Sequence, residues 1–438
     1  MRRIIGKTAL ILFVLAVIYL LVLWSEWLPL STPAGKKAVA IMGAPLPPIA
    51  DDDNAFSEIW LFSYDIPDAD KAKILAADIE KFSKSDSPLE YASAAEGKYP
   101  KFIDNENLLC KPKQENCLEQ IRLNLEKYDD LFSKNEKLSS KAIALTRFRT
   151  SRSQFSPGLS TPLANFSEPE DWQLTRAAYL HAKGKSAEAV DMTCRAAASW
   201  RGFAENSQGL IDQMVGQAYY AGQTQLFAKL LSENPKDTVL PESCVEAYRP
   251  VESKKFPLCH SMQLEFQMMR NFSKSMKSGS ISSYGEARPA TWSNKLSLLW
   301  FNQRASNETY ALNLASMCSD DNEIRQAANA PKEGVWNGLS VSELAFNPIG
   351  GILGTISSGT YSDYENRLQN ISLTQQALQA VLVQRKQGNP LVKPEDFLSE
   401  NKKLRFNTLS NAVEVDLFQS AKETRLLSLP LSGTKIDK

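Results

Sequence analysis

The pattern of hydrophobic and polar positions is helical along most of the chain. Apolar residues recur every three or four positions, the spacing of one helix face, most clearly between residues 167 and 235. Ser167 followed by Glu170 is a capping-box pattern that starts a helix, and Gly184 ends it. A second helix follows, and a further pair is expected on either side of Gly222. The segment therefore predicts two successive α-hairpins.

The two hairpins resemble tetratricopeptide repeats, with a period of roughly 35 residues. The matching positions are Trp172, Tyr179 and Ala187 in the first unit and Leu210, Phe227 and Pro235 in the second. The resemblance covers about seventy residues and implies stacked antiparallel helices with a concave groove. Ordinary antiparallel helix packing, without a repeat, is the alternative.

The C-terminal part adds a long helix and a small sheet. A helix is expected over residues 360–387, after a glycine cluster at 350–354. Such glycines favour close helix packing, with an anion-binding cradle as the alternative. Hydrophobicity alternates over residues 404–431, as it does in strands. We expect a mainly α fold: an N-terminal transmembrane helix, an extracytoplasmic bundle of α-hairpins and a small C-terminal antiparallel β element.

The N-terminal residues have the pattern of a membrane anchor. An uninterrupted apolar run extends from Thr8 to Trp24, and at about 1.5 Å per residue it spans most of the roughly 30 Å hydrocarbon layer. Cations precede the run and tryptophans suit the far interface: Arg2, Arg3, Lys7, Trp24 and Trp27. We expect a single pass through the inner membrane at residues 8–28, with the N-terminus cytoplasmic. A signal peptide cleaved near residues 38–40 is the alternative.

Composition divides the rest of the chain. Residues 1–28 form the cytoplasmic tail and anchor, and the proline-rich residues 29–54 predict a semi-extended stalk. Residues 55–272 predict a helical domain with α-hairpins, and residues 289–438 a helical segment with the long helix and the small sheet. The interval between them is rich in Ser, Lys and Gly, and we expect an exposed boundary loop there.

The cysteines predict a disulfide framework. There are six, an even number, and all follow the anchor. Two pairs are close in sequence, and elimination leaves the third: Cys110 with Cys117, Cys244 with Cys259, and Cys194 with Cys318. Six buried free thiols are the alternative. Disulfides would place this part of the chain in an oxidising compartment.

Charge and residue types argue against several functions. Lys+Arg 50 and Asp+Glu 50 give a net charge of +0, so we expect no nucleic-acid partner. The two histidines, His181 and His260, form no metal-binding pair, and no complete catalytic motif occurs. We expect no cofactor, no metal site and no catalytic residues. Whether the chain is an enzyme is left open, with the missing motifs favouring a non-enzyme.

These features predict a single-pass protein of the bacterial inner membrane whose bulk lies in the periplasm. Its expected role is non-enzymatic: a partner-binding or scaffold component of the cell envelope. An envelope enzyme that acts on cell-wall or glycan material through carboxylate acid-base chemistry is the alternative function. A Golgi type II membrane protein is the alternative location, because a short tail, one anchor and a proline-rich stem are also its layout.

Overall fold

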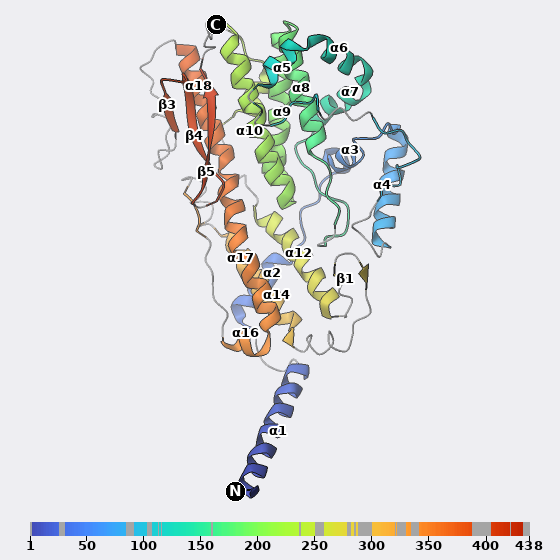
Figure 1. Cartoon of the computed structure of the whole chain (residues 1–438), viewed down its shortest axis with the longest axis vertical. Coiled ribbons are helices and arrows are strands. Elements are labelled where there is room, and N and C mark those ends of the chain that lie inside the picture. The colour runs from blue at the N-terminus through green and yellow to red at the C-terminus, as the bar shows by residue number, and fades with distance from the viewer. Residues whose placement is uncertain are drawn as a thin grey trace.

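The computed structural model in Figure 1 describes the larger part of the chain. The described residues are 2–25, 31–84, 92–102, 107–112, 114, 116–158, 161–235, 238–249, 258–277, 282–283, 286–287, 300–319, 321, 330–333, 341–387, 404–420 and 422–431. Of the predicted anchor residues, Trp27 lies outside this set. Arg2, Arg3, Lys7 and Trp24 belong to a described helix, but their side chains lie outside the described part.

The described elements are mostly helices. The N-terminal elements are α1 (Arg2–Ser25), α2 (Pro33–Met42), η1 (Asp51–Asp53), α3 (Phe56–Trp60), α4 (Asp68–Ser83), α5 (Cys117–Leu123), α6 (Leu125–Lys134), α7 (Glu136–Ala144) and η3 (Leu145–Arg147). The middle of the chain forms α8 (Ser167–Ala182), α9 (Ser186–Asn206), α10 (Leu210–Glu233), α11 (Glu242–Ala247), α12 (Leu258–Lys277), β1 (Ser282–Ser283) and β2 (Glu286–Ala287). The C-terminal elements are α14 (Gln303–Ala315), η6 (Ser316–Cys318), α16 (Val341–Phe346), α17 (Pro348–Leu368), α18 (Asn370–Gln387), β3 (Leu404–Asn407), β4 (Ala412–Phe418) and β5 (Thr424–Pro430).

Three consecutive antiparallel helices, α8, α9 and α10, form the centre of the upper half of the body in Figure 1. Trp172 and Trp200 are buried between them, and the indole of Trp200 donates a hydrogen bond of 2.8 Å to Gln173 Oε1. The helices α9 and α10 approach closely at Gly216, where an added Cβ would lie 2.6 Å from the backbone nitrogen of Ala204. Burial of the aromatic rings, together with this close approach, determines how the three helices pack.

The predicted break at Gly222 is wrong, because α10 is continuous through it. A Cβ at Gly222 would lie 3.2 Å from Cβ of Pro112, so the position needs a small residue and does not end the helix. The helices therefore make one hairpin, α8 with α9, followed by a single long helix. The predicted pair of hairpins is not formed, and the tetratricopeptide-like reading has no support in the structure.

The predicted capping box at the start of α8 is also wrong. Phe166 occupies the N-cap position and no side chain caps the helix. Glu170 does not turn back to the helix end but is fully buried, where its Oε2 accepts a hydrogen bond of 3.1 Å from Gln223 of α10. The side chain that suggested a cap therefore belongs to the interior of the bundle.

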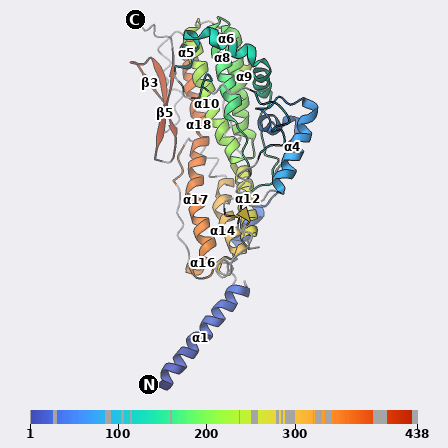
Figure 2. The ribbon, with the colours of Figure 1, turned by 45° about the vertical axis from the view of Figure 1, so that its right-hand side comes forward.

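The predicted long helix is two helices, α17 and α18, which meet at Gln369. They run one after the other along most of the height of the body in Figures 1 and 2. The glycine cluster lies in the first turns of α17. A Cβ at Gly354 would lie 2.8 Å from Thr309 of α14, which confirms the prediction that these glycines serve close helix packing.

The small antiparallel sheet is confirmed. Its order is β3-β4-β5, and the central strand β4 pairs Val415 with Leu404 on one side and with Leu427 on the other. Apolar side chains of β4 face α18, which the sheet covers on one side of the molecule (Figure 2). The alternation of apolar and polar residues over 404–431 therefore corresponds to a sheet with one buried face.

The predicted stalk is not extended throughout. Residues 33–42 form α2, which begins with Pro33 after a Thr32 side-chain cap and packs against α14. The carboxylate of Glu308 on α14 accepts hydrogen bonds from Ser31 Oγ (2.5 Å) and from the backbone of Thr32 (3.0 Å). Proline in a first turn is compatible with a helix, so proline content alone misled the prediction.

The helix α1 projects from the end of the body where α2, α14 and α16 lie (Figure 1). Its described apolar side chains are largely exposed: Leu10, Ile11, Leu12, Phe13, Val14, Leu15, Val17, Ile18 and Leu21. The hydroxyl of Tyr19 donates a hydrogen bond of 2.6 Å to the carbonyl of Ala345 on α16. Within the described residues, however, no helix combines the length and apolar character that a membrane crossing requires. The anchor therefore stays a prediction.

All six cysteines are in disulfides, and one of the three predicted pairs is correct. Cys110 is joined to Cys117, as predicted. The other two predicted pairs are wrong, because Cys194 is joined to Cys244 and Cys259 to Cys318. The short spacing of Cys244 and Cys259 misled the prediction, since Cys244 lies on α11 against α9, while Cys259 lies on α12 beside η6.

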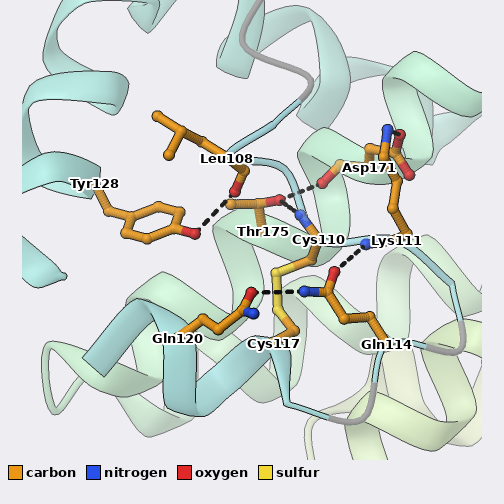
Figure 3. The surroundings of a disulfide bond; sticks show 9 residues. All are labelled: Leu108, Cys110, Lys111, Gln114, Cys117, Gln120, Tyr128, Asp171 and Thr175. Atoms are coloured by element: carbon orange, nitrogen blue, oxygen red, sulfur yellow. Dashed lines mark hydrogen bonds and ion pairs between the residues drawn. A yellow bond between two sulfur atoms is a disulfide. The ribbon is translucent and has the colours of Figure 1, made fainter. Parts of the chain in front are cut away.

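Figure 3 shows how the Cys110–Cys117 segment is held against the bundle. The hydroxyl of Thr175 on α8 accepts a hydrogen bond of 2.8 Å from the backbone N–H of Cys110 and donates one of 2.6 Å to the carbonyl of Asp171. Tyr128 donates to the carbonyl of Leu108 at 2.9 Å. These bonds satisfy polar backbone groups that would otherwise be buried without partners.

One cluster of buried apolar side chains runs from Ala38 to Leu429 and includes residues of both predicted domains. The helix α12 extends to Lys277, so the predicted boundary loop begins later than expected. The division into residues 55–272 and 289–438 stays a prediction.

Candidate functional site

An apolar pocket lies where α10, α12, α14 and α17 meet the loop segments 153–158 and 161–163. We call it the Tyr361 pocket. Its volume is about 580 Å³, within the range of roughly 300–1,000 Å³ usual for ligand sites. The lining residues are Ser153, Phe155, Pro157, Gly158, Thr161, Leu163, Gly209, Leu210, Ile211, Asp212, Leu264, Glu265, Met268, Met269, Phe272, Tyr310, Leu353, Tyr361 and Tyr364.

One face of α12 forms a wall of the pocket. Leu264, Met268 and Phe272 are spaced four residues apart, which places them in one row along the helix. Methionine side chains are flexible and polarisable, so they adapt to apolar partners of different shapes. The disulfide between Cys259, at the start of α12, and Cys318, just after α14, ties together two of the helices that line the pocket.

The loop wall is held by hydrogen bonds at several points. The side chain of Asn54 accepts from the backbone N–H of Arg152 at 2.9 Å and donates to its carbonyl at 3.0 Å. Further along, Asn271 of α12 donates to the carbonyl of Pro157 at 2.8 Å. The ring of Phe155 contacts the ring of Trp60 edge-on, with centroids 4.9 Å apart. The loop is therefore a fixed part of the pocket.

Asp212 brings a carboxyl group to the pocket from the first turn of α10. Its side chain is half-buried, and burial raises its pKa from 3.8 to about 7. Desolvation disfavours the charged form of a carboxyl, which explains the direction of this shift. Near neutral pH, Asp212 therefore exists as a mixture of the acid and the carboxylate.

A second carboxyl, that of Glu265, faces the pocket from α12. Burial raises the pKa of Glu265, and the hydrogen bond of 3.0 Å from the Tyr361 hydroxyl opposes that rise. Burial also raises the pKa of Tyr310, to about 12, and that of Tyr361 further still. The tyrosines are therefore neutral hydrogen-bond donors at physiological pH.

The pocket suits a largely apolar occupant. Most of its lining side chains are aliphatic, aromatic or methionine, and its polar groups are the two carboxyls, the tyrosine hydroxyls and the hydroxyls of Ser153 and Thr161. Smaller cavities lie beside Cys110 (about 250 Å³), beside Val190 (about 450 Å³) and beside Lys36 (about 400 Å³). The described residues that line the first two include no Asp or Glu, and the third is lined mainly by surface polar side chains, so none of them combines an apolar wall with two acids.

Few of the residues that the sequence singled out line the pocket. Leu210, a position of the predicted repeat, does so, and none of the six cysteines does. The side chains of the predicted anchor residues lie outside the described part of the chain. His181 is 3.1 Å from a carboxylate oxygen of Glu233, at the opposite end of α10 from Asp212. No group of His, Cys, Asp and Glu among the described residues could hold a metal ion.

The sequence contained one usable signal for this pocket. The α12 segment has apolar residues on both of its sides, and Met268 and Met269 lie next to each other where a simple amphipathic helix would turn a polar residue outwards. Nothing in the sequence links that helix to Asp212 or Tyr361, because the elements that meet here are far apart in the chain.

Comparison of the chain with protein-family models, with curated proteins and with solved structures finds no match in any of the three.

Proposed function

We propose that the chain is a membrane-anchored binding protein of the bacterial periplasm that holds an apolar segment of another envelope protein in the Tyr361 pocket. The pocket carries this proposal. A preformed, mostly apolar cavity with a few polar groups is the usual form of a binding site. Its walls come from rigid helices and from a loop held by the side chains of Asn54 and Asn271.

The location is supported by two further features. The apolar side chains of α1 are largely exposed, as expected for a helix that is surrounded by lipid. Three disulfides suit an oxidising compartment. Cations before the apolar run favour a cytoplasmic N-terminus and hence a periplasmic body.

Site-directed photocrosslinking in intact cells tests the proposal. A benzophenone amino acid replaces Ile211 or Leu163, which line the pocket and are 39% and 67% exposed. The matched control is Leu123 on α5, which is 75% exposed and does not line the pocket. We expect a discrete crosslinked protein from the two pocket positions and none from Leu123. The same products from all three positions, or none from the pocket, would refute the proposal.

A second candidate function is an envelope hydrolase. It is favoured by one observation, the two carboxyls of raised pKa in the same pocket, since a carboxyl with a pKa near 7 suits general acid catalysis. The apolar walls suit a sugar poorly, because its hydroxyls need polar partners. Incubation of the full chain with isolated cell wall, followed by mass spectrometry, should detect released fragments that Asp212→Asn abolishes if this function is correct.

A further inference from the structure

Two acids, Asp212 and Glu265, line the Tyr361 pocket. The described residues that line it include no Lys, Arg or His. Neither carboxyl forms an ion pair within the described part of the chain. Arg367 lies nearby, 5.6 Å from the ring centroid of Tyr364, but its guanidinium donates to the backbone carbonyl of Gln419 at 2.8 Å.

Several other buried acids among the described residues have a cation beside them. Glu205 on α9 forms ion pairs with Arg201 at 2.6 Å and with Arg249 at 3.2 Å. The carboxylate of Glu365 on α17 lies 3.0 Å from Lys332. Glu170 lacks a cation, but it is enclosed in the core and accepts a hydrogen bond from Gln223. The two pocket acids differ from these residues, because they have no ion pair among the described residues and are also open to a cavity that an outside molecule can enter.

Burial of an unpaired carboxylate is unfavourable, and a cation that enters the pocket removes that cost. Burial raises the pKa of both acids, as expected when desolvation disfavours the charged carboxylate. A positively charged occupant would return both carboxyls to their ionised state. An anionic occupant would meet two acids and no cation, so fatty acids and phospholipid phosphates fit this pocket poorly.

Aromatic rings in the pocket add to the preference for a cation. Tyr310, Tyr361 and Tyr364 line it together with Phe155 and Phe272, and the ring centroids of Tyr361 and Tyr364 are 6.3 Å apart. The face of an aromatic ring attracts ammonium and guanidinium groups. Carboxylates and aromatic rings thus act in the same direction, while the leucines and methionines favour an apolar body.

We propose that the partner segment bound in the Tyr361 pocket presents a Lys or Arg side chain to Asp212 and Glu265, with its apolar residues against α12. This inference rests on the proposed function and names the chemistry of the occupant. A partner's side chain suits the site because its long aliphatic stem can lie along the apolar walls while its charged end reaches the acids.

A set of probes with one apolar body and different charges tests the inference. Hexylammonium, 1-hexanol and hexanoate are titrated calorimetrically into the full chain in non-ionic detergent, with empty micelles as the blank. The variants are Asp212→Asn and Glu265→Gln. Glu126→Gln, at an exposed position of α6 outside the pocket, is the matched control for the loss of one negative charge.

We expect hexylammonium to bind at least about tenfold more tightly than hexanoate, a difference of about 1.4 kcal/mol. The preference should fall to less than about threefold in the Asp212→Asn, Glu265→Gln double variant and persist in Glu126→Gln. Equal binding of the two ions, or a preference that survives the double variant, would overturn the inference. Photocrosslinks from Ile211 that persist in that case would leave the proposed function standing, whereas their absence would remove both.

Discussion

The hydroxyl of Tyr361 on α17 donates a hydrogen bond of 3.0 Å to Glu265 on α12. This bond joins two helices that lie about a hundred residues apart in the chain, and both side chains line the same pocket. Because the hydroxyl stays protonated and Glu265 is largely surrounded by protein, the pair orients one of the two pocket acids. The other acid, Asp212, lies beside the Ser151 side chain, which opposes part of the rise in its pKa, and it also lines the pocket.

Asp212→Asn should stabilise the protein at high pH. The ordinary pKa of 3.8 applies to the unfolded chain and the value of about 7 to the folded one, so the folded state binds the proton more tightly. The wild type therefore loses stability as the pH rises from 3.8 to about 7, and the asparagine variant does not. One pKa unit corresponds to about 1.4 kcal/mol. We therefore expect the free energy of unfolding of the variant, relative to the wild type, to be higher at pH 8 than at pH 5 by on the order of 1–3 kcal/mol.

Urea unfolding at the two pH values measures this difference. The control is Glu126→Gln, which removes a carboxylate from an exposed position and should change stability little at either pH. If Asp212→Asn is equally stable or less stable than the wild type at pH 8, the ionised carboxylate of Asp212 does not destabilise the folded protein.

Loss of the Cys194–Cys244 disulfide should be more destabilising than loss of Cys110–Cys117. The first pair closes a loop with a sequence separation of 50 and the second one of 7. From the entropy that a disulfide removes from the unfolded chain, we expect a stabilisation of the folded state of about 4 kcal/mol for the longer loop and about 2 kcal/mol for the shorter one. Double Cys→Ala variants of each pair, compared by urea unfolding, measure the order. Peptide mapping without reductant checks the connectivity, and a linked peptide containing Cys244 and Cys259 would contradict it.

Gly216→Ala should destabilise the bundle although alanine favours helices. A Cβ at this position would lie 2.6 Å from the nitrogen of Ala204 and 2.7 Å from the carbonyl oxygen of Trp200. Overpacking of this kind costs about 1–3 kcal/mol, and backbone atoms cannot move aside as a flexible side chain can. Ala218→Gly, at an exposed position of the same helix, isolates the helix-propensity effect of about 1 kcal/mol. Thermal unfolding in which Gly216→Ala is the more stable protein would contradict the packing of α9 against α10.

The topology of the chain is open to a direct measurement. An alkaline phosphatase fused to the C-terminus is active only outside the cytoplasm, and we expect an active fusion. Removal of the positive charges at Arg2, Arg3 and Lys7 should reduce that activity, because these residues set the orientation. A fusion that is inactive while a cytoplasmic reporter at the same site is active would contradict the periplasmic location.

Local patterns predicted the helices and strands of this fold better than their pairing. The alternation of apolar and polar residues over 404–431 was sufficient to predict the sheet, because a strand with one buried face has an apolar residue at every second position. The break at Gly222 and the cap at Glu170 were misread because contacts with Pro112 and Gln223 from distant segments decide those positions. The same holds for the disulfides, since Cys194 and Cys244 meet only after α11 has packed against α9.

The sequence marked one wall of the candidate site, the methionines of α12, but not the set of residues that forms it. Asp212, Glu265 and Tyr361 belong to three helices, and each of these residues is unremarkable among its own neighbours in the chain. Only the packing of α12 against α14, and of α17 against α10 and α14, brings them to one pocket. The raised pKa of Asp212 is likewise a product of burial by residues that are distant in sequence.

The photocrosslink from Ile211, measured with and without Met268→Trp, tests most directly whether the Tyr361 pocket is the binding site. Met268 lines the wall formed by α12, and a tryptophan there would fill much of the cavity. The binding function predicts a discrete crosslinked partner from Ile211 that disappears when Met268→Trp is added, while the protein stays folded by urea unfolding. A crosslink of unchanged yield in the filled variant would show that the partner binds elsewhere.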